Sequence, residues 1–193
     1  MLSRLKNIKH NILSNEWATL LRVDYDYKLQ NGKWVSVSRE SYDRGNGASI
    51  FLYNSKLGQV ILTKQFRMPA YINDTNDGES IEVCAGAVGK DEDPLECIIR
   101  EVEEEVGYRL NSAIQVLEGY TSPGAVTEKM YFFIAEYSEN QKVSEGGGLD
   151  SEDEDIEVLK LPFKEAYAMI ETGRIKDAKS IILLQYAKLN SLL

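Results

Sequence analysis

The sequence predicts an α/β fold in which helices pack on a mixed sheet, preceded by an N-terminal antiparallel β appendage. Early segments alternate apolar and polar residues, one central segment combines several helix signals, and two late segments have helical apolar spacing. The 193 residues are 43% hydrophobic, which is enough to build a sizeable core. We expect residues 1–45 to form the appendage and residues 46–193 to form one domain.

The appendage is predicted from two alternating segments, Trp17–Tyr27 and Lys33–Glu40. Between them Asn31 and Gly32 suit a two-residue hairpin turn, because both residue types tolerate a positive φ. The glycine-containing run that starts at Asp43 breaks the alternation and marks the expected boundary.

The second domain begins with two strands joined by a short turn, and further strands and helices follow along the chain. The predicted strands are Ala48–Tyr53, Gln59–Phe66, Ser80–Ala85 (ended by Gly86), Ala113–Glu118, Met130–Glu136 and Ile156–Leu161, with a turn at Ser122–Gly124, and the late helices are Phe163–Glu171 and Lys176–Leu189. Such a mixture of strands and helices indicates a sheet with helices packed on it.

One helix carries start and stop signals of its own. Asp93 suits the N-cap, Pro94 suits the first helical position, and Glu96 would complete a capping box. Apolar residues then recur at helical spacing until Gly107, which suits the C-terminal cap. We therefore expect a helix between Asp93 and Gly107.

Composition excludes several classes of function. The net charge of −9 argues against a protein that binds nucleic acid or anionic membranes, which needs clustered cations. Two cysteines and one histidine are too few for a disulfide framework, a cysteine-based zinc site or an evident nucleophile–histidine pair. Without an apolar segment of membrane-spanning length or a signal peptide, we expect a soluble cytoplasmic protein whose chemistry uses carboxylates.

Acidic side chains form a stripe on the central helix. At about 100° per residue, Glu101, Glu104 and Glu105 share one arc of the helix, whereas Glu103 points away from it. Three carboxylates this close repel one another, and such a set of oxygen ligands suits Mg²⁺ or Mn²⁺. A solvated acidic face is the alternative interpretation. Arg100 is expected to pair with Glu92 or Glu104.

The residues around this stripe resemble the signature of the Nudix hydrolases at each fixed position. Those positions are Gly86, Glu92, Arg100, Glu101, Val102, Glu104, Glu105 and Gly107, with Tyr108 where the family usually has an aliphatic residue. The resemblance implies an α/β/α sandwich and a Mg²⁺-dependent pyrophosphohydrolase, with Mn²⁺ as a substitute. It also implies metal binding by the Ala85 carbonyl, Glu101 and Glu105, with Glu104 near the metal.

Further motifs are similar to the nucleotide-sugar branch of the family, and most closely to its GDP-mannose-cleaving members. They are Tyr42–Ala48, Gln65–Arg67, Ser122–Glu128 with Pro123, Gly146–Gly148, Glu152–Val158 and Thr172–Lys179. The resemblance implies hydrolysis of GDP-mannose to GMP and mannose 1-phosphate by a homodimer assembled through the appendage. Hydrolysis of ADP-ribose, and a non-catalytic ligand sensor, are the alternatives.

The same resemblance implies a set of substrate contacts from both parts of the chain. They are Trp17, Ser38, Arg39, Glu40, Arg67, Ala85, Gly86, Glu105, Glu128, Asp153, Glu154 and Lys179. Trp17 could stack on a base or pack on the sheet, and a strand arginine such as Arg39 or Arg67 is often simply solvated.

The acidic loop that precedes Ile156 supplies the last candidates. We expect Glu154 to be a further metal ligand, and Glu154 or Glu152 to orient or deprotonate the attacking water. Gly146–Gly148 would let this loop close over the substrate. The candidate catalytic residues are thus Glu104, Glu105, Glu152 and Glu154, and the alternative interpretation of the loop is a solvated, disordered tract.

Overall fold

The computed structural model describes residues 4–73, 77–149, 151 and 153–193. Its contacts divide the chain into two compact units. One comprises Met1–Asn46 with Tyr120–Lys129, and the other comprises Gly47–Gly119 with Met130–Leu193.

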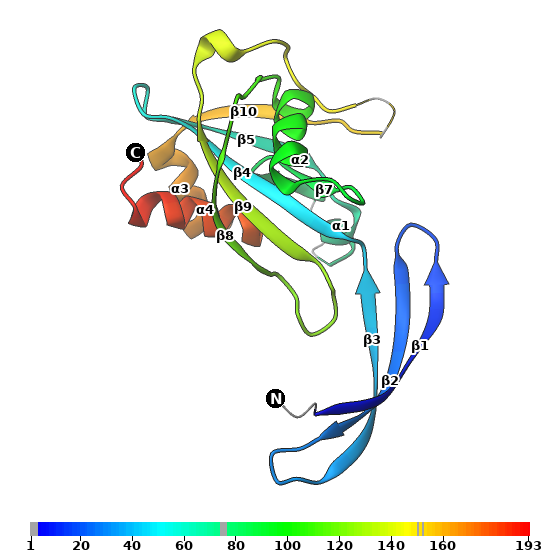
Figure 1. The fold of residues 1–193 in the computed structure, drawn as a ribbon. Coiled ribbons are helices and arrows are strands. Elements are labelled where there is room, and N and C mark those ends of the chain that lie inside the picture. Colours follow the sequence, from blue (N-terminus) through cyan, green and yellow to red (C-terminus); the bar gives the residue numbers. More distant parts are fainter. Residues whose placement is uncertain (1–3, 74–76, 150, 152) are drawn as a thin grey trace. The chain divides into compact units, whose positions relative to one another are not determined.

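The first unit is built on a three-stranded antiparallel sheet of order β1-β2-β3 (Figure 1). Its strands are β1 (Leu5–Asn15), β2 (Thr19–Lys28) and β3 (Trp34–Asp43). The antiparallel appendage is therefore confirmed, but β1 is an additional strand that the sequence did not predict. Every residue of β1 is exposed, and its register with β2 shifts twice. The strand therefore lacks the alternation of apolar and polar residues by which a half-buried strand is recognised in a sequence.

The turn between β2 and β3 is one residue longer than expected. Leu29 N–H donates to the Lys33 carbonyl oxygen at 2.8 Å, which leaves three residues in the loop. Of the two expected turn residues only Gly32 has a positive φ, +85°, so the prediction of a two-residue turn is wrong. The Asn31 side chain instead accepts a hydrogen bond from Lys33 N–H at 3.1 Å.

The second unit contains a mixed seven-stranded sheet with the order β10-β5-β4-β9-β8, to which β6 and β7 are added beside β5 and β4. The strands are β4 (Asn46–Asn54), β5 (Gln59–Phe66), β6 (Glu79–Glu82), β7 (Ala85–Val88), β8 (Ile114–Tyr120), β9 (Lys129–Glu136) and β10 (Glu157–Pro162). β4 runs antiparallel to β5 and parallel to β9, which confirms a mixed sheet.

Two cores cover the two faces of this sheet. Along β4, Phe51 packs into one core with the helices α3 and α4, whereas its neighbours Ile50 and Leu52 pack into the other with α2. The helices are α1 (Met68–Asn73), α2 (Pro94–Glu101), the π-helix η1 (Val102–Val106), the 3₁₀-helix η2 (Glu139–Gln141), α3 (Phe163–Glu171) and α4 (Ala178–Leu189). Helices on both faces make the α/β/α sandwich visible in Figure 1.

The segment before α2 differs from the expected single strand. β6 and β7 are separate strands that pair with β5 and β4, and Gly86 lies inside β7 rather than ending a strand. The short helix α1 was also not predicted; it has no buried residue and hence no apolar periodicity. Within the described part of the chain, no helix is both long and apolar enough to cross a membrane.

Candidate functional site

The acidic helix predicted between Asp93 and Gly107 consists of α2 and η1, and it is fixed at both ends. Asp93 accepts a hydrogen bond from Leu95 N–H at 2.8 Å and Pro94 opens the helix, as expected. After Glu101 the helix widens into η1, a form often found at functional sites. Gly107 ends it with φ +80°, and a Cβ there would lie 2.3 Å from a backbone oxygen of Ser144.

Arg100 contacts three carboxylates, two on this helix and one just before it. Its Nε lies 3.3 Å from Glu92, Nη1 lies 2.7 Å from Glu104, and Nη2 lies 3.0 Å from Glu101. The sequence left Glu92 and Glu104 open as alternatives, and Arg100 pairs with both. Glu103 instead pairs with Arg109, at 2.6 Å. Arg100 therefore gathers the acidic groups that flank the candidate metal site.

Glu105 is the most enclosed carboxylate of the helix, with 2% exposure. Burial raises its pKa to about 8, and the nearby charges of Glu101 and Glu154 add to this effect. Burial and the charge of Glu104 likewise raise the pKa of Glu101. These groups are close enough to oppose one another's ionisation, as expected where a cation is to bind.

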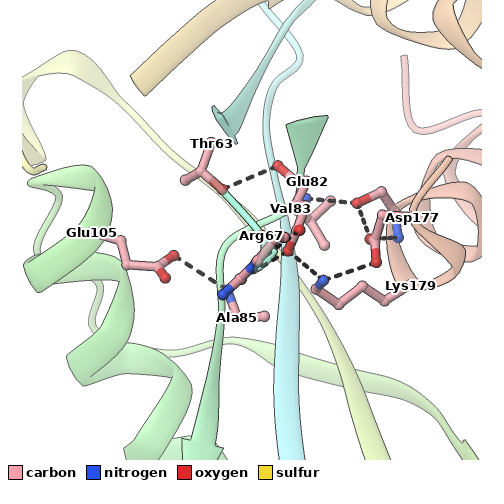
Figure 2. Close-up of polar contacts among 9 residues, drawn as sticks. Thr63, Arg67, Glu82, Val83, Ala85, Glu105, Asp177 and Lys179 are labelled. Atoms are coloured by element: carbon pink, nitrogen blue, oxygen red, sulfur yellow. Dashed lines mark hydrogen bonds and ion pairs between the residues drawn. The ribbon is translucent and has the colours of Figure 1, made fainter. Parts of the chain in front are cut away.

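Gly86 provides the space in which Glu101 lies. A Cβ at this position would lie 2.1 Å from the Glu101 carboxylate, so no larger residue fits without moving it. The neighbouring Ala85 N–H donates to Glu105 Oε2 at 3.3 Å (Figure 2). The strand β7 thus contacts both glutamates, while metal binding by the Ala85 carbonyl stays a prediction.

The donor set fits a hard divalent cation, because it consists of carboxylates that raise one another's pKa. Among the described residues, no group of three His, Cys, Asp or Glu side chains already has the arrangement of a metal cage. Glu101 and Glu104 are engaged by Arg100 instead.

The glycine-rich loop packs on the end of the acidic helix. Gly147 and Gly148 N–H groups donate to the carbonyl oxygens of Glu105 and Glu104 at 2.9 and 3.2 Å. The half-buried Glu154 accepts from Leu149 N–H at 3.0 Å, and a Cβ at Gly148 would lie 2.5 Å from its carboxylate. The loop backbone packs closely on the helix end and on Glu154, which explains why this segment contains glycines. Closure of the loop over substrate stays a prediction.

Two other candidates belong to the same loop. Asp153 is exposed and has a φ of +55°. Glu152 lies outside the described residues, so its expected role as a catalytic base has no structural account.

Arg67 and Lys179 meet at a residue that the sequence did not single out, Glu82 (Figure 2). Arg67 donates from Nε and Nη2 to the two Glu82 oxygens at 3.1 and 3.0 Å, and Lys179 Nζ lies 2.6 Å from Oε2. Burial opposes ionisation of Glu82, yet Lys179 and Arg67 lower its pKa to about 2. Arg67 is therefore an ordered ion-pair partner rather than a merely solvated strand arginine.

Asp177 extends this network to the start of α4. It caps the helix by accepting from Ser180 N–H at 2.8 Å, and it lies 2.9 Å from Lys179 Nζ. Ser180 Oγ in turn accepts from Val83 N–H at 2.7 Å. Asp177 and Glu82 offset the unfavourable position of Lys179 at a helix N-terminus. The motif Thr172–Lys179 includes Asp177. Glu82 carried no such signal, because it lies inside the predicted strand Ser80–Ala85 and only the structure ends β6 at this residue.

The remaining candidates lie in the first unit. Trp17, in the turn between β1 and β2, is 78% exposed, with the Arg44 guanidinium 5.6 Å from its ring centre. Glu128 is buried and ion-paired with Arg44 at 3.1 Å. Ser38, Arg39 and Glu40 follow one another along β3. Arg39 and Glu40 line a hollow of about 630 Å³ together with Tyr25, Tyr120 and Gly124–Thr127.

Comparison with known proteins agrees with this geometry. Residues 43–184 match the NUDIX domain family, and residues 4–42 match the GDP-mannose pyrophosphatase NudK N-terminal domain. The chain is 50% identical to a GDP-mannose pyrophosphatase of Yersinia enterocolitica over 98% of both chains. It is 47% identical, over the full length of both chains, to proteins of that name from Shigella flexneri and Escherichia coli O157:H7. With its acidic helix, its Gly86 contact and these matches along its length, the chain belongs to the Nudix hydrolase family.

Proposed function

We propose that this chain hydrolyses GDP-mannose to GMP and mannose 1-phosphate with Mg²⁺. The observation that carries the proposal is the buried Glu105 beside Glu101 and Glu154, a carboxylate group suited to a divalent ion that meets a diphosphate. The choice of substrate follows the full-length relatives, which are named GDP-mannose pyrophosphatases. Nudix hydrolases generally use a divalent metal, and Mn²⁺ could substitute for Mg²⁺.

In this proposal the metal would be held by the Ala85 carbonyl, Glu101, Glu105 and Glu154. When bound, it supplies positive charge to the diphosphate and lowers the pKa of a water molecule. Glu104 is kept beside this group by Arg100, at 2.7 Å. Glu154, or Glu152, would orient the attacking water and take its proton.

Substrate binding is assigned to cations and to the first unit. Arg67 and Lys179 would contact the phosphates, with Gly86 leaving room beside the acidic helix. The exposed Trp17 face suits stacking on a base, which an aromatic ring provides with little loss of conformational entropy. The other proposed contacts are Ser38, Arg39, Glu40, Glu128 and Asp153.

We further propose a homodimer assembled through the appendage, residues 1–45. The supporting observation is that β1 is exposed along its entire length and carries large apolar side chains, including Leu5, Ile8 and Ile12. Sedimentation of the full chain, compared with a variant carrying Ile8→Asp and Ile12→Asp, tests this. If the wild-type protein sediments as a monomer, the proposed homodimer is contradicted. The cytoplasmic location stays a prediction.

A substrate panel tests the reaction. Purified protein is given GDP-mannose, ADP-ribose and other nucleoside diphosphate sugars, with Mg²⁺ or with a chelator, and the products are identified. We expect the highest kcat/KM for GDP-mannose, release of GMP and mannose 1-phosphate, and no turnover with the chelator. Preference for ADP-ribose would redirect the assignment within the family, and no turnover of any compound would favour a ligand sensor.

The catalytic base is tested by changing Glu154→Gln and Glu152→Gln separately. The variant that removes the base should lose kcat by orders of magnitude at saturating Mg²⁺. If both variants keep nearly normal kcat, the base lies elsewhere and this part of the proposal is wrong.

A further inference from the structure

We propose that Glu82 is a positioning residue that sets the orientation of two cations, Arg67 and Lys179, toward the phosphates of the substrate. The inference rests on the proposed function and extends it to a residue that contacts neither metal nor substrate. It starts from the ion pairs in the centre of Figure 2.

The geometry leaves Arg67 little freedom. Glu82 accepts from Nε and Nη2 of the guanidinium, a two-point contact that fixes both the place and the plane of the group. The same Oε2 receives Lys179 Nζ at 2.6 Å. One carboxylate therefore sets the separation of the two cations.

Glu82 itself is held by its surroundings. It ends β6, where it pairs with Thr63 of β5, and its side chain is 5% exposed. On the far side, Asp177 contacts Lys179 at 2.9 Å and caps α4. The carboxylate is thus fixed by the sheet, while the second cation is also fixed by a helix end.

The exposure of Arg67 distinguishes it from a partner in a purely structural ion pair. The Arg67 side chain is 42% exposed although its partner is almost fully buried. Glu82 occupies the Nε–Nη2 edge, so Nη1 is directed away from the buried carboxylate. The charge of Glu105 also acts on Arg67, so the guanidinium is within electrostatic reach of the acidic helix as well as of Glu82.

This placement has a chemical consequence. Charge that develops on a phosphate during cleavage is best stabilised by donors that are already oriented, because no reorganisation is then needed. The two cations are balanced by Glu82 and Asp177 in the free protein, which keeps them ordered until an anion arrives. Glu82 would act only through these cations.

The test compares Glu82→Gln, Glu82→Asp and a matched control, Thr63→Val. Thr63 Oγ1 bonds to the backbone of Glu82 at 3.3 Å, so the control perturbs the same strand pair without touching either cation. We expect Glu82→Gln to lower kcat/KM for GDP-mannose by about ten- to a hundredfold, as loss of an orienting contact does elsewhere. The Mg²⁺ concentration for half-maximal activity should stay unchanged, because the metal-site carboxylates keep their contacts.

Glu82→Asp separates position from stability. It keeps the buried negative charge but withdraws the carboxylate toward the strand by one methylene. Its melting temperature should therefore be close to that of the wild type, while its kcat/KM stays as low as that of Glu82→Gln. A double-mutant cycle with Arg67→Ala adds a second readout. If Glu82 acts through Arg67, the double variant loses much less activity than the two single losses multiplied together.

The proposal is overturned if both Glu82 variants keep the kcat/KM of Thr63→Val, or if the Glu82 and Arg67 losses multiply independently. Activity that falls only in proportion to the folded fraction overturns it too. A wild-type protein that fails to cleave GDP-mannose contradicts the proposed function instead, so the two failures are distinguishable.

Discussion

Glu105→Gln should stabilise the metal-free protein, although we expect the same substitution to abolish hydrolysis. Glu105 is 2% exposed, and burial with two neighbouring carboxylates raises its pKa from 4.5 to about 8. In the unfolded chain the group ionises at its ordinary pKa, whereas in the folded protein it resists ionisation. Stability is therefore lost as pH rises between these two values.

The size of this stability loss follows from the interval between the unfolded and folded pKa values of Glu105. Each pH unit between 4.5 and 8 costs about 1.4 kcal/mol of unfolding free energy, as long as only the unfolded chain is ionised. At pH 7 the accumulated cost is about 3 kcal/mol, and above the folded pKa it levels off. Glutamine at this position does not titrate, and it can still accept the Ala85 N–H bond.

The assay is urea unfolding between pH 5 and pH 8 in the presence of a chelator. We expect the free energy of unfolding of the wild type to fall with pH relative to Glu105→Gln. Mg²⁺ should then stabilise the wild type more than the variant, because bound cation offsets the repulsion. Glu103→Gln is the matched control, since Glu103 lies on the same π-helix and pairs with Arg109.

Parallel pH profiles for the wild type and Glu105→Gln would refute the reasoning. So would an equal effect in Glu103→Gln. Turnover that is unchanged in Glu105→Gln would exclude this carboxylate from metal binding.

Three further predictions follow from individual residues. Gly86→Ala should displace the Glu101 carboxylate, 2.1 Å from the new Cβ, and raise the Mg²⁺ concentration needed for half-maximal activity; an unchanged Mg²⁺ titration would contradict this. Because ion pairs lower the pKa of Glu82 from 4.5 to about 2, its stabilising effect is complete above pH 4.5 and is lost toward pH 2. Acid unfolding of Glu82→Gln should accordingly lack that pH dependence, and a wild-type profile would count against it. Gly107→Ala, blocked by backbone at 2.3 Å, should lower stability by more than about 2 kcal/mol, whereas Gly173→Ala, in open space, should lose only about 1 kcal/mol; equal losses in urea unfolding would show that φ alone matters.

Predictions succeeded where the signal is local. Asp93, Pro94 and Gly107 bound the acidic helix because caps depend on neighbouring residues. Two short, largely apolar segments joined by a turn predicted the strand pair β4 and β5, and residues of both strands enter the two cores. The widening into η1 was not predictable in this way, because it does not interrupt the apolar spacing of the helix. The strand β1 was not predictable either, because it is exposed along its whole length and has no apolar alternation.

The sequence by itself determined the family, the mixed α/β class and the acidic helix, because these depend on fixed spacing and on periodicity along a short stretch of chain. Only the tertiary structure decided which charges meet. Lys179 and Glu82 are 97 residues apart in the sequence, and they contact each other because β6 ends beside the start of α4. Tertiary packing buries both Glu82 and Glu105, yet their pKa values move in opposite directions. Lys179 and Arg67 lower the pKa of Glu82, whereas burial and the charges of Glu101 and Glu154 raise the pKa of Glu105.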